Sequence, residues 1–296
     1  MKLDDNSETV IDYKLWRHGP SRIAFRGPTQ ELDVPYVAIV GGSETFGKFV
    51  EYPFADLLRA EIAMPVVNLG VMHAGLSLIV DDPAILDIAS NAQMTVVQVL
   101  GATNMSNRFY SVHPRRNDRF VCASKRMKVL FPDVDFADIN FTGHLLTALE
   151  KERHPGFGEL VAELKTAWVQ RMSAILDSIH GDRLLLWMSD RRPEDPSSVE
   201  HSTDPMFVDR DMLEALSPLI GGIVEVVATK HSRDEGLIGK FYQASDEQAA
   251  AAMPGPAFHC QTAAALAQTI GEPEKEGRTV STGAPSESDR PIKASR

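Results

Sequence analysis

The chain has 296 residues, of which 43% are hydrophobic and 24% charged, with 30 basic residues against 41 acidic ones and a formal net charge of −11. This composition is typical of a globular protein, and it excludes disordered, collagen-like and coiled-coil chains. The excess of negative charge argues against non-specific binding to nucleic acids or to anionic membranes.

Runs rich in β-branched and aliphatic residues alternate with helical patterns along the chain. Strands are expected at residues 36–40, 65–69, 94–100, 183–188 and 222–227, and helices at residues 53–63, 83–92, 157–178, 210–216 and 261–270. The alternation predicts an α/β fold in which a five-stranded, mostly parallel sheet is the middle layer of a three-layer α/β/α sandwich. Because ligands bind at the carboxyl ends of the strands in such sheets, the residues that follow each strand form the candidate site.

The distribution of apolar residues divides the chain into three segments. Residues 36–270 are expected to form the α/β domain, and residues 1–35 an N-terminal extension that packs on it. Residues 271–296 contain five acidic and five basic residues, no aromatic residue and few apolar ones. We therefore expect a disordered C-terminal tail.

Two cysteines, Cys122 and Cys260, provide neither a disulfide framework nor the paired spacing of a zinc site. We expect a reducing compartment, no metal and no cofactor. The N-terminus is acidic where a signal peptide is basic, and no apolar run reaches the roughly 18 residues of a membrane span. The sequence therefore predicts a cytoplasmic protein with no membrane partner.

The first predicted strand is followed by a glycine-rich turn that carries a serine, Gly41-Gly42-Ser43. A serine on a tight turn between a strand and a helix exposes its hydroxyl beside the helix N-terminus, which suits a nucleophile. The same serine can instead be a simple helix cap. Gly42, Gly47 and Lys48 also match most of a phosphate-binding loop, although Phe49 stands where that loop needs a hydroxyl for magnesium.

Further motifs follow the second and third strands and precede the last predicted helix: Gly70 and Gly75, Asn104, and His259. Together with Ser43, in this order, they resemble the blocks of the SGNH, or GDSL-type, hydrolase superfamily across the whole predicted α/β domain. The resemblance implies a flavodoxin-like fold and esterase, lipase or deacetylase chemistry without a metal. It also implies that Ser43 is the nucleophile and His259 the general base, and that Gly70 or Gly75 with Asn104 donates to the oxyanion.

The chain departs from the family pattern in three places. Glycine replaces the aspartate that usually precedes the serine. Asn104 lies one residue later than in the family, which makes Asn107 a competing donor. Pro256 occupies the place of the acid, three residues before the histidine. A Ser–His dyad is therefore expected, with Asp190 or Asp246 as an alternative source of the acid.

A basic segment follows the third strand in this otherwise acidic chain. From Gly101 to Leu130 there are seven basic residues and one acidic residue, and we expect this segment to form a rim beside the site. The candidate substrate-binding residues are Asn107, Arg108, His113, Arg115 and Arg116. Arginine binds carboxylates and phosphates through its planar fork, but these arginines can equally pair with acidic residues of the same chain.

The sequence therefore predicts an SGNH-like serine hydrolase or acyltransferase that acts on an O-acyl ester of a small molecule or carbohydrate, for which an anionic sugar or acidic metabolite is the expected class. Two alternatives stay open. One is a non-catalytic protein of the same fold that binds an anionic glycan or a partner protein. The other is a nucleotide-binding transferase in which the segment from Gly42 to Lys48 serves as a phosphate-binding loop. The sequence does not indicate an oligomeric state.

Overall fold

The computed structural model describes residues 11–197, 199, 204–271 and 278–281. Six parallel strands form one sheet in the order β2-β1-β3-β6-β7-β8. The strands are β1 (Val37–Gly41), β2 (Val66–Gly70), β3 (Met94–Gln98), β6 (Asp182–Ser189), β7 (Gly222–Val227) and β8 (Arg278–Ser281). The first five have the flavodoxin-like order, which confirms the predicted fold class.

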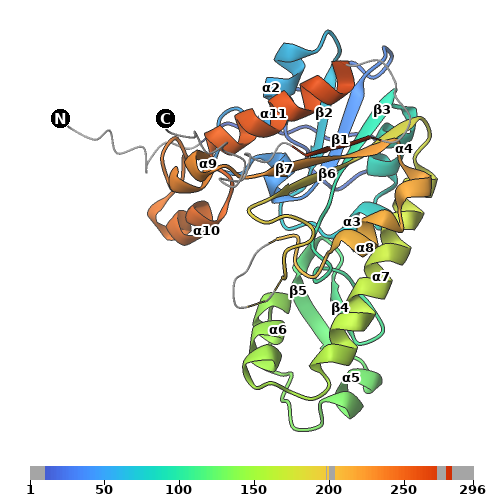
Figure 1. Ribbon diagram of the computed structural model, residues 1–296, viewed down its shortest axis with the longest axis vertical. Helices are drawn as coiled ribbons and strands as arrows, with labels where there is room; N and C mark the ends of the chain where they lie inside the picture. Colours follow the sequence, from blue (N-terminus) through green and yellow to red (C-terminus); the bar gives the residue numbers. More distant parts are fainter. Residues whose placement is uncertain (1–10, 198, 200–203, 272–277, 282–296) are drawn as a thin grey trace, which may run out of the picture.

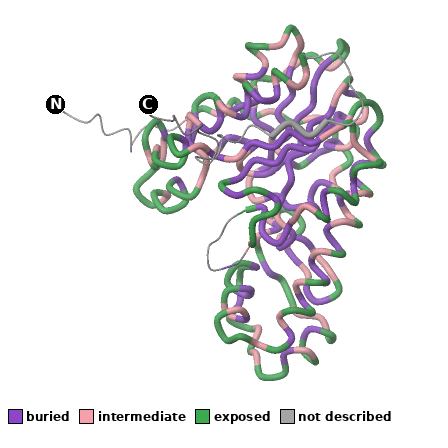
Figure 2. Tube along the Cα trace, viewed as in Figure 1, coloured by how far each residue is buried: buried purple, intermediate pink, exposed green. Residues whose placement is uncertain are grey.

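Helices cover both faces of this sheet (Figure 1). On one face lie α3 (Leu76–Asp81), α4 (Pro83–Asn91), α7 (Phe157–Ser178) and α8 (Arg210–Glu214), and on the other lie α2 (Phe54–Glu61) and α11 (Pro256–Gly271). Alternate residues of β1 belong to separate apolar clusters: Ala38 and Val40 pack on the first face, Val37 and Ile39 on the second. The strands are therefore apolar on both sides, as a covered parallel sheet requires, and Figure 2 shows the buried residues concentrated along them.

The sheet domain also contains several short helices. They are α1 (Ser43–Phe46), α9 (Lys230–Asp234), α10 (Glu247–Ala252) and two 3₁₀ turns, Ser217–Leu219 and Ala244–Asp246. Figure 1 places α9 and α10 beside the first turns of α11. None of the helices in the described part of the chain combines the length and hydropathy that crossing a bilayer requires.

A second lobe, residues 101–156, is inserted between β3 and α7, and we call it the cap (Figure 1). It contains an antiparallel hairpin of β4 (Tyr110–His113) and β5 (Arg116–Ala123), followed by α5 (Lys125–Leu130) and α6 (Thr142–Lys151). From the sequence, this region was expected only to form a basic rim. The alternation of buried and less buried residues in β4 is the signal of a half-buried strand, and four residues are too few for it to stand out in the sequence.

One buried residue of the cap, Asn117, ties the hairpin to the sheet domain. Its side-chain Oδ1 accepts hydrogen bonds from the backbone N–H groups of Gly75 and Leu78, both at 2.9 Å, where α3 begins. Its Nδ2 donates to the carbonyl of His113 at 3.0 Å, and its own backbone N–H donates to the carbonyl of His73 at 3.1 Å. The loop between β2 and α3 is thereby fixed against the cap.

The two end segments of the described chain also contact the domain. The buried guanidinium of Arg26 donates to four carbonyls of the turn after α1, those of Phe46, Gly47, Val50 and Glu51. At the other end, β8 lies within the segment expected to be a disordered tail. Its Thr279 and Val280 are β-branched and pair with β7, whose edge would otherwise be open. The rest of that tail lies outside the described residues.

Replacing Asn117 with Ala should lower the free energy of unfolding by about 2–4 kcal/mol, because two buried N–H groups lose their acceptor. Asn117→Asp keeps an acceptor for both groups and should cost less. Urea unfolding of the full chain measures both, with Asn140→Ala, an exposed asparagine of the cap, as the matched control. Equal midpoints for Asn117→Ala and the control would contradict the clamp.

Candidate active site

Ser43 begins α1 directly after β1, with Gly42 in extended backbone as the N-cap. The turn is held by Gln98 at the end of β3, whose Oε1 accepts hydrogen bonds from the Gly42 N–H at 3.0 Å and from the Thr45 hydroxyl at 2.6 Å. The Ser43 side chain is half-buried, and its Oγ accepts a hydrogen bond from the backbone N–H of His73 at 3.0 Å. The serine hydroxyl is thus held between the loops that follow β1 and β2.

A hollow of about 140 Å³ opens beside Ser43. Its wall includes residues of the loops after β1, β2 and β3, and one residue of β5 in the cap. The polar side chains that line it together with Ser43 are those of His73, Asn104 and Asp118, as well as Glu44, Gln98 and Asp204. The structure therefore brings Ser43 and Asn104, two of the predicted site residues, into one small cavity.

The two glycines expected to donate to an oxyanion have their N–H groups engaged elsewhere. Gly70 donates to the side chain of Asn68 and Gly75 to that of Asn117, each at 2.9 Å. The expectation that Gly70 or Gly75 donates to an oxyanion is therefore corrected. The backbone N–H group that donates to Ser43 Oγ is that of His73. His73 has a φ of +60°, an uncommon conformation for a residue other than glycine, and no local pattern in the sequence indicated it.

Close packing explains the glycines at these positions. A Cβ at Gly70 would collide with the backbone of Phe46 in α1, and a Cβ at Gly75 would collide with the carbonyl oxygen of Asn104. The loops after the first three strands approach one another through these two contacts. The two glycines therefore allow the loops to pack closely around the site, but their N–H groups are not donors to a ligand there.

Asn104 and Asn107, the two competing donors, have different surroundings. The Oδ1 of Asn104 accepts a hydrogen bond from the Thr142 hydroxyl at 2.6 Å, and its Nδ2 has no hydrogen-bond partner among the described residues. Asn107 uses Oδ1 to accept from the N–H groups of Phe109 and Tyr110, and Nδ2 to donate to the Met105 carbonyl. Asn107 therefore shapes a turn, and Asn104 is the asparagine with an amide available to the hollow.

His73, which lies within the second sequence block and could either face the pocket or pack in the core, lines the hollow beside the serine together with Asp118. The Nδ1 of His73 lies 3.5 Å from Oδ2 of Asp118, which also accepts hydrogen bonds from the guanidinium of Arg116. Burial lowers the pKa of the His73 imidazole below its ordinary value of 6.5, an effect that Asp118 opposes and Arg116 adds to. The imidazole is therefore neutral at pH 7, the form that can accept a proton.

His259, the predicted general base, is not brought to Ser43. The last helix begins at Pro256 and not at residue 261, so His259 lies in its first turn and packs against α2. Its Nδ1 accepts a hydrogen bond from the Phe54 N–H at 3.1 Å, and its ring stacks on the Phe54 ring. The side chain is 1% exposed and does not line the hollow beside Ser43.

This environment makes His259 a capping residue of α2 and a poor base. Burial, with Arg26 and Lys240 nearby, lowers the pKa of the imidazole to about 3. Because Nδ1 accepts a hydrogen bond, the hydrogen of the neutral ring is on Nε2, and no nitrogen is left to take a proton from a serine. Neither Asp190 nor Asp246 forms a hydrogen bond or ion pair with His259 among the described residues.

The predicted basic rim does not face Ser43. Arg108 forms an ion pair with Glu163 of α7, and Arg116 pairs with Asp118. His113 and Arg115 lie at the turn of the hairpin, where the Arg115 N–H donates to the His113 ring. Among the described residues that line the hollow there is no arginine or lysine, and three carboxylates are present.

The phosphate-loop interpretation is also not favoured by the backbone. Residues 43–46 form a helical turn that ends at Gly47, and Phe49 is buried behind it. The Lys48 ammonium lies over the Phe49 ring, 4.4 Å from its centre. The segment therefore lacks the open loop of N–H groups that surrounds a phosphate.

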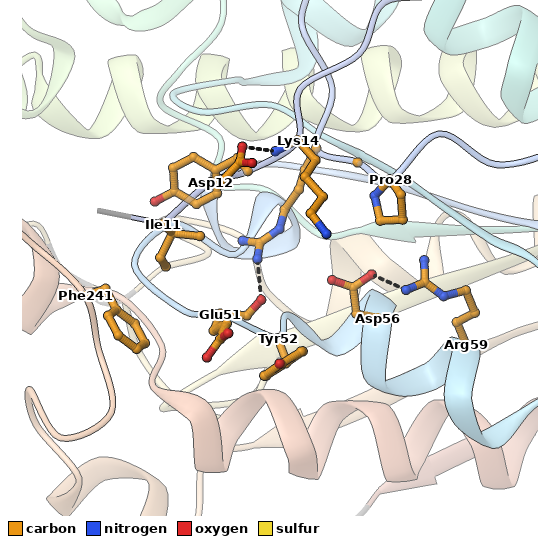
Figure 3. Close-up of a pocket in the computed structure, with 12 residues that line it drawn as sticks. Ile11, Asp12, Lys14, Pro28, Glu51, Tyr52, Asp56, Arg59 and Phe241 are labelled. Atoms are coloured by element: carbon orange, nitrogen blue, oxygen red, sulfur yellow. Dashed lines mark hydrogen bonds and ion pairs between the residues drawn. The ribbon is translucent and has the colours of Figure 1, made fainter. Parts of the chain in front are cut away.

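Two of the larger hollows outside this cavity have charged walls. One of about 380 Å³ adjoins it and shares Glu44, Met188 and Asp204 with it. The other, about 410 Å³, lies between the N-terminal segment and the start of α2 (Figure 3). Its Asp56 and Arg59 pair with each other at 3.1 Å, so these two charges neutralise one another.

Replacing His259 with Asn should weaken the dependence of stability on pH. In acid, the unfolded chain binds a proton at His259 that the native state does not bind, so stability is lost as pH falls below about 6.5. This group alone should remove up to about 3 kcal/mol by pH 4. The substituted amide would still accept from Phe54 but cannot titrate. Urea unfolding between pH 7 and pH 4 measures the difference, with exposed His180→Asn as control; parallel pH profiles for wild type and His259→Asn would contradict it.

Comparisons with known proteins give one family and several coarse structural likenesses. The lipase Lip_vut3 from a goat rumen metagenome is 12% identical, with 80% of this chain and 98% of that chain covered and a TM-score of 0.44. LAE5, an α/β hydrolase enzyme from the metagenome of Lake Arreo, Spain, is 15% identical (80% and 95% covered, TM-score 0.41). The lipase/acylhydrolase from Enterococcus faecalis is 12% identical (82% and 100% covered, TM-score 0.40).

Likenesses at these identities and TM-scores assign no activity to this chain. No curated protein matches it. The family model described as "Domain of unknown function (DUF6473)" matches residues 1–274. The chain therefore belongs to the DUF6473 family.

Proposed function

We propose that this protein is an SGNH-like serine hydrolase or acyltransferase that cleaves a short-chain O-acyl ester. The observation that carries the proposal is the placement of the Ser43 hydroxyl, which accepts a hydrogen bond from the His73 N–H. Asn104 lines the same small hollow, and its Nδ2 has no hydrogen-bond partner among the described residues. A hydroxyl at the end of a strand, with N–H donors beside it, is the arrangement that acyl transfer requires.

In the proposed first step, Ser43 Oγ forms a bond to the ester carbonyl carbon, and the carbonyl oxygen takes the negative charge. The backbone N–H of His73 and the Asn104 Nδ2 are donors on the wall of the hollow, and they would stabilise this oxyanion. Collapse of the intermediate breaks the bond to the alcohol and leaves the acyl group on Ser43. Water or a second alcohol then removes it by the reverse sequence.

His73 is the proposed proton carrier in place of His259. Nδ1 lies 3.5 Å from Asp118 Oδ2, and a hydrogen on Nδ1 would leave Nε2 free to take the proton of Ser43 and give it to the departing alkoxide. The imidazole and Oγ form no direct hydrogen bond in the structure, so the transfer requires a rotation of the serine side chain or one bridging water. Catalytic hydrogen bonds are commonly loose in the absence of substrate.

The size and the lining of the hollow restrict the class of ester that we propose as substrate. A volume of about 140 Å³ accommodates a short acyl group, and the adjoining hollow of about 380 Å³ provides room for the alcohol. Glu44 and Asp204 line both hollows and form no ion pair with a described residue. We therefore propose an ester that is neutral or cationic near the reacting carbonyl, in place of the anionic substrate expected from the basic segment.

A fluorophosphonate probe should label the folded wild-type protein on Ser43, because an activated serine hydroxyl displaces fluoride from the probe and is phosphonylated. Replacing Ser43 with Ala should abolish labelling and lower the turnover of an aryl acetate at least about a thousandfold. Ser178→Ala, an exposed serine of α7, is the matched control. Peptide mapping locates the adduct; a folded wild-type protein with no adduct on Ser43 would overturn the proposal.

The pH dependence of kcat/KM should show an acid limb with its midpoint below pH 6.5, since His73 must be neutral and its pKa is lowered by burial. The negative charge of Asp118 stabilises the protonated ring, so Asp118→Asn should move the midpoint to lower pH. It should also lower the plateau rate, because the ring loses its orienting acceptor. Asp138→Asn, an exposed site in the cap, is the control. A limb that Asp118→Asn leaves in place, or moves upward, would exclude His73 as the base.

A further inference from the structure

Thr142, at the start of α6 in the cap, forms the hydrogen bond that fixes the orientation of the Asn104 amide. Its side chain is 2% exposed. Its hydroxyl lies 2.6 Å from Asn104 Oδ1, and the Asp118 carbonyl, at 3.3 Å, is the only other acceptor near it among the described residues. A hydroxyl has one hydrogen, and the shorter contact takes it. Thr142 is therefore a donor to Asn104.

This hydrogen bond fixes which end of the amide is engaged, on a residue that lines the hollow together with Ser43. A carboxamide can rotate by half a turn and exchange its oxygen and nitrogen, and the two orientations differ only in the hydrogen bonds they make. With Oδ1 held by Thr142, the Nδ2 group is left as the end without a partner among the described residues. The second hydroxyl near Oδ1, that of Thr103, lies at 3.4 Å and is too distant to hold it strongly.

The backbone of Asn104 is fixed independently of Thr142. The carbonyl of Asn104 packs directly on Gly75, whose N–H is bound by the buried Asn117. Loss of the Thr142 hydroxyl would thus leave the residue in place and free only its side-chain amide to rotate. A defect at Thr142 can therefore be separated from a general loss of the loop.

We propose that Thr142 is a positioning residue that holds Asn104 with Nδ2 directed at the oxyanion of the reaction at Ser43. The inference rests on the proposed function, because an oxyanion forms only if Ser43 attacks an ester. It assigns a role in the reaction to the cap, through a residue that does not touch the substrate. Substrate binding needs no oxyanion donor, whereas the transition state does.

The test is the Thr142→Val variant, which keeps the volume of the side chain and removes the donor. We expect kcat for an aryl acetate to fall about ten- to a hundredfold with KM changed less than about twofold, a smaller loss than removal of an oxyanion donor itself. Thr142→Ser restores the donor and should recover most of the rate. Thr166→Val, an exposed threonine of α7, controls for the substitution.

A double-mutant cycle separates positioning from folding. If Thr142 acts through Asn104, adding Thr142→Val to Asn104→Ala should lower kcat by less than about twofold. An equal loss on both backgrounds, or a wild-type rate in Thr142→Val, would overturn the inference. Fluorophosphonate labelling of the wild-type protein separates the proposed function from the role of Thr142. If Ser43 carries no adduct, the proposed function itself is overturned. If Ser43 is labelled normally and the kcat of Thr142→Val equals that of wild type, only the positioning role is overturned.

Discussion

The four hydrogen bonds of Asn117 are the constraint on which the site depends. This side chain is fully buried and belongs to the cap, yet two of its bonds hold the first turn of α3 and a third, from its backbone, holds the carbonyl of His73. A buried amide without hydrogen-bond partners costs free energy of folding. The loop after β2 and the hairpin can therefore adopt only arrangements in which the Asn117 amide and the N–H groups that it binds are all hydrogen-bonded. The position of His73, and with it the donor to Ser43, follows from this requirement.

Two further buried polar contacts connect the three loops at the carboxyl edge of the sheet. Gln98 accepts from the turn that carries Ser43, and Thr142 donates to Asn104. Gly70 and Gly75 allow the loops to approach closely enough for these contacts. Several side chains around the hollow beside Ser43 thus have fixed partners, and the Nδ2 group of Asn104 is left without one among the described residues. Preorganisation of this kind is what electrostatic stabilisation of a transition state requires.

Acidic side chains line the site where the sequence indicated basic ones, and burial raises the pKa of two of them, Glu44 and Asp204. The basic residues between Gly101 and Leu130 do follow β3, but the folded cap pairs several of them with acidic partners. Arg108 and Arg126 bind carboxylates of α7, Glu163 and Glu159, and Arg116 binds its neighbour Asp118. A local count of charges records which residues are present but not which residues pair, and pairing depends on the packing of the cap against α7.

The sequence by itself determined the layers of the sheet domain, the five central strands and the place of Ser43, because apolar periodicity and glycine-rich turns are local signals. It also singled out Asn104. Only the tertiary structure decided that His259 caps α2, and that His73 and Asp118, a residue of the cap, line the hollow beside the serine. These residues meet across separations of tens to hundreds of positions. Their partners are fixed by buried hydrogen bonds that the chain can satisfy only once it is folded.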